Sequence, residues 1–254
     1  MTLAYIDRED FLANYWSYEP GEHVSFIQPT GGGKTHLAFQ LLQRTPIPAT
    51  ALVMKPRDPV PASWTQRLGW REIPHWPPPA RLPWQPKSDS YTLWPHQSLV
   101  DLEADENHLH DQFERALLDT YRKGDRIIFA DEVAGLCELK LQRHLRALWM
   151  RGSGMGAGLW AATQKPSGDQ GGAPVPTYLY SAPSHLFLGH DQTAANRKRF
   201  NEIGGVDGHV VEDAVMNLRL HPVKTNAGVT KHVSEQLYIR KGGPSGAYMA
   251  VIGI

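Results

Sequence analysis

The sequence predicts an α/β fold in which a mainly parallel central sheet is flanked by helices. Apolar runs of strand length alternate along the chain with stretches of helical periodicity, which is the pattern of such folds. Residues 28–35 form a glycine-rich segment between the first clear strand and the first clear helix. Because 254 residues suit one large domain better than two, we expect a single domain over residues 1–254.

The first part of the chain combines a regular and an irregular stretch. The expected strand, glycine-rich segment, amphipathic helix and second strand cover residues 24–27, 28–35, 36–44 and 51–54. From Pro59 to Pro86, prolines and tryptophans argue against regular structure. We therefore expect an irregular surface excursion over about residues 59–90.

In the remainder, short apolar runs mark the strands and periodic stretches mark the helices. The strands are expected over 91–94, 126–130, 159–162, 186–188, 236–240 and 247–251. One helix is expected from about Asp105 to Lys123, where Gly124 ends it, and another over 137–150. Residues 166–176 are rich in glycine and proline and predict a loop.

Segment 28–35 has the residue types that bind nucleotide phosphates. Glycines allow backbone N–H groups to turn inward around the phosphates, Lys34 can reach the β and γ oxygens, and Thr35 offers a hydroxyl to Mg²⁺. The usual pattern opens with a further glycine where this chain has Gln28, and we expect Gln28→Gly to leave hydrolysis intact. The expected nucleotide-binding residues are Gln28, Pro29, Thr30, Gly31, Gly32, Gly33, Lys34, Thr35 and His36.

Polar residues end two of the later strands. Asp131 and Glu132 follow the apolar run 126–130, and we assign Asp131, with Thr35, to Mg²⁺ and Glu132 to the base that deprotonates water. A base at this position favours an ATPase over a small-molecule kinase. Gln164, after the run 159–162, is assigned to sensing the γ-phosphate or positioning water. For both groups, an ordinary polar strand end is the alternative.

Three segments, in this order, resemble the FtsK/HerA superfamily of P-loop ATPases. They are Gln-Pro-Thr-Gly-Gly-Gly-Lys-Thr at 28–35, Ile-Ile-Phe-Ala-Asp-Glu at 127–132, and the run 156–166 with its Ala-Thr-Gln-Lys-Pro sequence. The first two correspond to the Walker A and Walker B motifs, and the third is the most specific. The resemblance extends over about residues 24–205, and within the superfamily the compact form of this chain looks similar to small ATPases encoded by phages and mobile elements.

The resemblance implies a RecA-like core of the additional-strand (ASCE) class and a homo-oligomeric ring, a hexamer or a pentamer. It further implies that ATP, with Mg²⁺, is hydrolysed between subunits to move double-stranded DNA through the ring. Viral genome packaging or DNA transfer would then be the function, with a phage capsid or portal as a partner. An assembly or secretion ATPase that acts on a protein partner is the alternative function.

The resemblance also implies an arginine that completes the site of a neighbouring subunit. The family often has this arginine where the present chain has Ser153, so we assign the role to Arg151, with Arg146 as the second candidate. Solvated arginines at a helix end are the alternative. Candidate DNA contacts are a basic stripe on the helix 137–150, with Lys140 and Arg143, and the basic run 197–199.

The bulk composition restricts the remaining possibilities. The formal net charge is zero, so any contact with DNA must depend on a local patch. The single cysteine, Cys137, fits a reducing compartment, and neither an export signal nor a membrane-spanning run is expected. We therefore expect a location in the bacterial host cytoplasm or with the virion. The histidine spacings match no ligand set, so no metal besides Mg²⁺ is expected.

Overall fold

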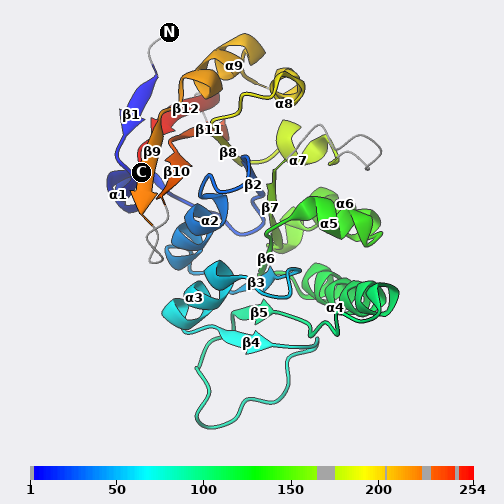
Figure 1. Cartoon of the computed structure of the whole chain (residues 1–254). Coiled ribbons are helices and arrows are strands. Elements are labelled where there is room, and N and C mark those ends of the chain that lie inside the picture. The colour runs from blue at the N-terminus through cyan, green and yellow to red at the C-terminus, as the bar shows by residue number, and fades with distance from the viewer. Residues whose placement is uncertain (1–2, 165–174, 204, 225–229, 244–245) are drawn as a thin grey trace. The chain divides into compact units, whose positions relative to one another are not determined.

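The computed structural model describes residues 3–164, 175–203, 205–224, 230–243 and 246–254 (Figure 1). The chain forms two compact units. Unit 1 comprises residues 1–17, 24–41 and 162–254, and unit 2 comprises residues 18–23 and 42–161. The expectation that both units belong to a single domain, which was based on the length of the chain, stays a prediction.

Unit 1 has a mixed sheet with the strand order β1-β12-β11-β8-β2. Its strands are β1 (Ala4–Ile6), β2 (Val24–Ile27), β8 (His185–Gly189), β11 (Gln236–Gly243) and β12 (Gly246–Ile252). Strands β2 and β8 are parallel, whereas β11 is antiparallel to both of its neighbours. The helices are α1 (Arg8–Asp10), α7 (Tyr178–Ser181), α8 (Ala194–Arg199) and α9 (Gly208–Asn217), with most of α2 (Lys34–Gln43). A buried cluster that includes Ile27, Leu188 and Leu237 forms the core.

Unit 2 has a sheet that is parallel throughout, with the strand order β7-β6-β3-β5-β4. Its strands are β3 (Ala49–Leu52), β4 (Arg71–Ile73), β5 (Tyr91–Leu93), β6 (Ile127–Ala130) and the first part of β7 (Gly158–Thr163). Its helices are α3 (Pro59–Leu68), α4 (Leu102–Lys123), α5 (Val133–Glu138) and α6 (Gln142–Arg151). Strand β6 is buried along its whole length, as a strand covered on both faces must be.

The chain connections explain which helix covers which face of this sheet. The connection from β3 through α3 to β4 runs toward one edge, and that from β5 through α4 to β6 runs toward the other. Because parallel crossovers are right-handed, α3 and α4 must lie on opposite faces, as Figure 1 shows. The crossover from β6 to β7 has the direction of the α4 crossover, and α6 accordingly packs against α4.

The predicted α/β fold with a mainly parallel sheet is confirmed. The segments expected as strands at 91–94, 126–130, 159–162, 186–188, 236–240 and 247–251 are β5, β6, β7, β8, β11 and β12, and Gly124 ends α4 as predicted. Strands β1, β9 (Leu220–Lys224) and β10 (Thr230–Ser234) and helices α7 to α9 were not predicted. The expected loop at 166–176 lies mostly outside the described residues, as do Lys165 and Pro166 of the third motif. The RecA-like ASCE assignment stays a prediction.

The absence of regular structure expected from residue 59 is wrong for the first part of that segment. Pro59 and Pro61 lie in the first turn of α3, where helix N–H groups have no partner within the helix, so a missing donor costs nothing. The Asp58 carboxylate accepts from the Val60 N–H (3.0 Å) and Gly69 ends the helix at φ +63°. Strand β4 then pairs with β5. The remainder, residues 74–90, contains no helix or strand.

The single helix expected over 137–150 is also wrong, because the chain forms α5 and α6 with an interruption between them. Lys140 has φ +60°, and Leu139 and Leu141 on either side of it are both buried. The left-handed residue allows both leucines to enter the core, which a continuous helix would not. The Gln142 side-chain amide donates to Cys137 O and satisfies the end of α5 (2.5 Å). Lys140 therefore does not belong to a basic stripe on α6.

Candidate nucleotide site

The glycine-rich loop lies between β2 and α2, as predicted. Gly31 and Gly33 have φ of +82° and +99°, which L side chains rarely adopt, so glycine is required at both positions. The Gly32 N–H donates to Pro29 O (3.3 Å), and the Leu37 N–H donates to Gly33 O (3.0 Å) in the first turn of α2. The loop thus delivers backbone N–H groups to a helix N-terminus, where an anion is favoured.

The three side chains that follow the loop differ in exposure. Lys34 begins α2 and is buried, with 8% of its surface exposed, whereas Thr35 is half-buried and His36 is exposed. A buried ammonium at the end of a phosphate-type loop is suited to a phosphate because both the charge and the helix terminus attract it. The position of His36 leaves its side chain in solvent.

Gln28 supports the loop from inside. Its side chain is 1% exposed, its amide nitrogen donates to Gly32 O, and its amide oxygen accepts from Gln236 Nε2 (2.7 Å). A Cβ atom on Gly32 would lie 2.0 Å from Gln28 Nε2, and one on Gly189 would lie 2.3 Å from Gln28 Cγ. The glutamine thus fills a slot between two glycines and ties the loop to β11.

Gln164 contacts the same loop from the end of β7. Its amide oxygen accepts a hydrogen bond from the Thr30 hydroxyl, and the Gln28 N–H donates to the neighbouring Thr163 O (3.1 Å). The Thr163 hydroxyl is buried and has no hydrogen-bond partner in the part of the chain that the structure describes. The polar end of β7 and the loop therefore form one network within unit 1.

The acidic pair of unit 2 is positioned by β6 and α5. Asp131 and Glu132 directly follow β6, both are half-buried, and Glu132 is the extended residue before the first turn of α5 (φ −141°, ψ 93°). A Cβ atom on Gly135 would lie 2.5 Å from Met54 Cε, so α5 lies tightly against the segment that follows β3. Two carboxylates at the carboxyl end of a parallel strand are suited to a hydrated cation and to proton transfer from water.

The two candidate arginines lie on α6 and are both exposed. Within the described residues neither has an ion-pair partner. Arg151 is the last residue of α6, and Arg146 lies about 1.4 turns before it.

The end of α6 is fixed from below by a buried histidine. His23 Nε2 donates to Trp149 O (2.7 Å), its Nδ1 accepts from the Leu159 N–H (3.0 Å), and its ring stacks on Trp149 (4.4 Å between centroids). Both ring nitrogens are therefore used by the neutral imidazole. Burial lowers the pKa of His23 to about 4, against the smaller opposing effect of the hydrogen bond to Trp149.

The basic run at 197–199 is largely neutralised by acids in the fold. Arg197 pairs with Glu212 (3.4 Å) and also donates to Asp191 O (3.2 Å), and Arg199 pairs with Glu202 (2.8 Å). The hydrogen bond from Arg199 is the largest cause that lowers the pKa of the Glu202 carboxyl. The run is thus a weaker candidate for a DNA contact than its sequence indicates.

Two features are absent from the described residues. No group of three or more His, Cys, Asp or Glu side chains among them is arranged to hold a metal ion. No helix in the described parts is both long and apolar enough to cross a membrane.

Gln236, Gly189 and His23 were not identified by sequence reasoning. Gln236 is the first residue of β11 and follows the polar residues Ser234 and Glu235, so its polarity did not stand out in the sequence as a signal of a buried contact. Gly189 at the end of β8 was an available signal, because a glycine in a strand often marks the close approach of another group.

No family model and no curated protein matches the sequence. Solved structures do match the fold. The genome packaging NTPase B204 from Sulfolobus turreted icosahedral virus 2, in complex with sulfate, is 10% identical, with a TM-score of 0.57 over 93% of this chain and 99% of that one. Its AMP complex gives a TM-score of 0.51 over 88% and 94%, at 10% identity. VirB4 of Thermoanaerobacter pseudethanolicus is 11% identical, with a TM-score of 0.56 over 88% and 90%. The chain thus shares its α/β fold with a packaging NTPase and with VirB4.

Proposed function

We propose that this protein is a Mg²⁺-dependent ATPase that acts as a ring-forming translocase of double-stranded DNA, in genome packaging or DNA transfer. The loop of unit 1 is the observation that carries the proposal. It combines two positive-φ glycines, a buried lysine at a helix N-terminus and a glutamine from β7 bonded to a loop threonine. These features suit the polyphosphate of a nucleotide.

The proposed roles follow from the chemistry of each side chain. The loop amides and Lys34 hold the β and γ phosphates, Thr35 and Asp131 hold Mg²⁺, and Glu132 accepts a proton from the attacking water. Bound Mg²⁺ would neutralise charge on the phosphates. Gln164 senses the γ-phosphate or positions the attacking water. Arg151 or Arg146 of a second copy stabilises the transition-state charge.

The choice of DNA as cargo draws support from the solved neighbours. The B204 protein is described as a genome packaging NTPase, and its fold covers nearly the whole of both chains. A homo-oligomer is proposed because α6 exposes arginines that have no ion-pair partner among the described residues. The alternative, an ATPase acting on a protein partner, is favoured by the zero net charge and by the ion-paired arginines of α8.

The test of hydrolysis uses two variants with different expected defects. Lys34→Ala should lose nucleotide binding, because it removes the charge that faces the phosphates. Glu132→Gln should still bind ATP but turn over roughly 10² to 10⁴ times more slowly, because an amide cannot accept the proton. Equilibrium binding of a fluorescent ATP analogue and phosphate release measure the two effects.

Glu138→Gln is the matched control, because Glu138 is an exposed acid on the same short helix and should change neither measurement. Hydrolysis without any phosphate acceptor separates an ATPase from a kinase. An ATPase rate that duplex DNA does not change at about 50 mM salt, where phosphate contacts are strongest, would favour the protein-partner alternative. Wild-type turnover in Glu132→Gln would remove that residue from the mechanism.

A further inference from the structure

Strands β9 and β10 form a two-stranded antiparallel ribbon that is separate from the large sheets (Figure 1). Lys224, Thr230, Lys231 and His232 are exposed, as are Leu220 and Val223 at 46% and 40% of their surfaces. An isolated hairpin that buries so little apolar surface contributes little to the stability of the fold. The ribbon therefore calls for an explanation outside the core of unit 1.

Residues 214–234, which include the ribbon, carry an excess of positive charge. The sequence contains no Asp or Glu from Ala214 to Ser234, whereas Arg219, Lys224 and Lys231 fall in this stretch with His221 and His232. The chain as a whole has a formal charge of zero. By contrast, the arginines of α8 are paired with Glu212 and Glu202.

The strand register distributes these cations over both faces of the ribbon. Lys224 pairs with Thr230, and His232 pairs with Pro222, so Lys224 and His232 share one face. Lys231 pairs with Val223 and shares the other face with His221. A ribbon with a lysine on each face presents charge to both sides of a groove into which it inserts, and a two-stranded ribbon has the width of the DNA major groove.

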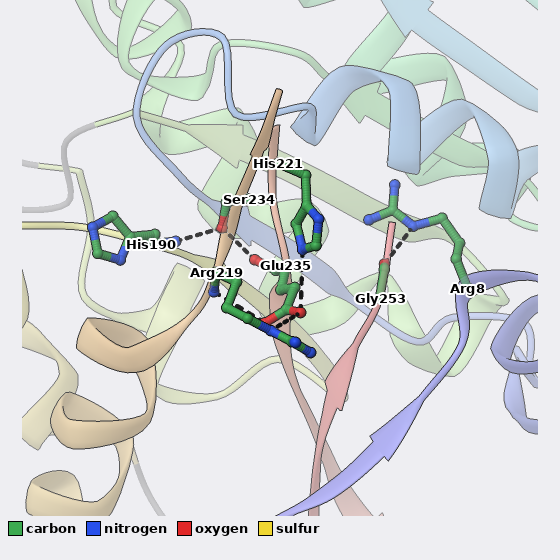
Figure 2. A network of polar contacts seen from close by, with 7 residues as sticks. All are labelled: Arg8, His190, Arg219, His221, Ser234, Glu235 and Gly253. Carbon is green, nitrogen blue, oxygen red and sulfur yellow. Dashed lines mark hydrogen bonds and ion pairs between the residues drawn. The ribbon is translucent and has the colours of Figure 1, made fainter. Parts of the chain in front are cut away.

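The root of the ribbon is fixed by a buried carboxylate (Figure 2). Glu235 accepts from the Arg219 N–H (3.0 Å) and Nε (2.8 Å), and its side chain is only 3% exposed. His221 Nε2 also lies 3.3 Å from this carboxylate, and the His190 N–H donates to the Ser234 hydroxyl (2.8 Å). Arg219 is thus used to hold the root, which leaves Lys224 and Lys231 as the outer cations.

The same root contacts the phosphate-binding loop. A Cβ atom on Gly33 would lie 3.0 Å from Val233 Cγ1, so the end of β10 packs directly on the loop. Gln236 lies three residues after Val233 and donates to the Gln28 side chain, whose amide in turn donates to Gly32 O. A displacement of the ribbon would therefore be transmitted to the loop through packing and through a buried hydrogen-bond chain.

We propose that the β9–β10 ribbon is the surface that contacts the phosphate backbone of duplex DNA, and that its root couples this contact to the nucleotide loop. The choice of duplex DNA as the ligand of the ribbon rests on the proposed function. Charge complementarity supplies the argument for the partner. Lys224 and Lys231 are exposed and form no ion pair among the described residues, and lysines on a thin ribbon suit a polyanion with a groove.

The test compares charge reversal on the ribbon with charge reversal elsewhere in the full-length protein. The double variant Lys224→Glu/Lys231→Glu should bind a fluorescent duplex at least about tenfold more weakly at 50 mM salt. The slope of its log affinity against log salt concentration should be shallower, by an amount that corresponds to the loss of up to about two phosphate contacts for each ribbon that touches DNA. Lys87→Glu, at an exposed lysine of unit 2, is the matched control and should behave like the wild type. Thermal melting verifies that each variant is folded.

A second variant tests the coupling. Val233→Ala removes the methyl groups that face Gly33 without changing charge, so it should keep the salt dependence of duplex binding but lose at least half of the DNA-stimulated increase in ATPase rate. Wild-type affinity in the lysine double variant, or weaker binding in Lys198→Glu on α8 in its place, would overturn the ribbon assignment. Full stimulation in Val233→Ala would overturn the coupling.

Binding to duplex DNA requires no hydrolysis, so the ribbon can be judged even in a protein without ATPase activity. A wild-type protein that hydrolyses ATP but binds no duplex would overturn the ribbon inference and leave the ATPase proposal standing. Ribbon-dependent binding of polyglutamate without binding of duplex would likewise overturn it, in favour of an acidic protein partner. Ribbon-dependent duplex binding without hydrolysis would support the surface and reject the ATPase.

Discussion

The loop over residues 28–35 and helix α6 carry two groups of residues assigned to ATP chemistry, and the chain holds them in different ways. The loop is supported inside unit 1 by Gln28, by the end of β7 and by the root of the ribbon. Helix α6 is fixed at its end by His23, but its arginines are exposed and have no partner within the described residues.

Under the proposed function, the difference predicts which part of the chemistry one chain supplies. A loop whose glycine conformations and buried amide contacts are set within the fold is preorganised to bind phosphate before any ligand arrives. A flexible exposed arginine is not preorganised, because its long side chain samples many rotamers until a charged partner fixes it. The comparison therefore predicts defects of the loop that stay within one subunit and defects of α6 that a second subunit can correct.

On α6, the largest effect is expected for Arg151→Ala. ATP binding should remain, whereas the hydrolysis rate should fall by a factor of about 10³, because the arginine that stabilises the charge of the transition state is removed. Phosphate release and analogue binding measure the two quantities. Arg146→Ala should change neither by more than a few fold, and the reverse result would transfer the role to Arg146.

Mixing experiments distinguish the two kinds of defect. Arg151→Ala subunits mixed with Glu132→Gln subunits should regain activity, because an intact arginine then meets an intact site. Lys34→Ala mixed with Glu132→Gln should regain none, since both changes affect the same half of the site. Rescue in the second mixture would show that the loop is completed by a neighbour after all.

A smaller effect is expected for the loss of the Gln28 side chain. The sequence suggested that its removal would be harmless, whereas its buried contacts in the structure predict a defect. Removing this side chain leaves the Gln236 amide and Gly32 O without a partner in a buried slot. Gln28→Ala should therefore lower the free energy of unfolding by about 1–3 kcal/mol and raise KM for ATP more than it lowers kcat. Urea unfolding and steady-state kinetics give the two results.

The double variant Gln28→Met/Gln236→Met separates stability from loop geometry. It removes both amides but keeps their volume, so most of the lost stability should return. The higher KM should persist, because Gly32 O still has no donor. A normal KM in this variant would mean that the amide serves stability alone, and Gln28→Gly would then be as harmless to hydrolysis as the sequence suggested.

The sequence was sufficient for the parts of the fold that short contiguous patterns determine. The loop, the acidic pair and most strands each consist of a few adjacent residues with a local physical requirement, and the structure places them as expected. The interruption between α5 and α6 could not be predicted, because the left-handed Lys140 is favoured only by the burial of Leu139 and Leu141 in the completed core.

Contacts between distant residues were also beyond sequence reasoning. Gln28 and Gln236 are separated by 208 positions and meet only when β11 has joined the sheet beside β8. The capped helix α3 was missed because its two cap residues, Asp58 and Gly69, lie in a segment whose many prolines argue against a helix. The roles of the site residues stay predictions, whereas their positions are set by the structure.

The effect expected to change hydrolysis least concerns the anchor of α6 and depends on pH. The folded protein holds His23 neutral, with its pKa lowered to about 4 by burial, whereas the pKa of an imidazole in the unfolded chain is about 6.5. Between these values the unfolded chain binds a proton that the folded chain does not. Stability should therefore be complete above about pH 6.5 and decrease as the pH falls toward 4, by about 3 kcal/mol in total from this group.

His23→Gln tests this contribution, because an amide can donate to Trp149 O and accept from the Leu159 N–H without titrating. Its free energy of unfolding should depend less on pH between 6.5 and 4 than that of the wild type, whereas His75→Gln, at an exposed histidine of the same unit, should leave the dependence unchanged. Hydrogen exchange should show the acid loss first at the Gly152 N–H, which closes the last turn of α6 on Leu148 O. Equal slopes in His23→Gln and the wild type would mean that α6 is held by packing alone and that its arginines are positioned without this histidine.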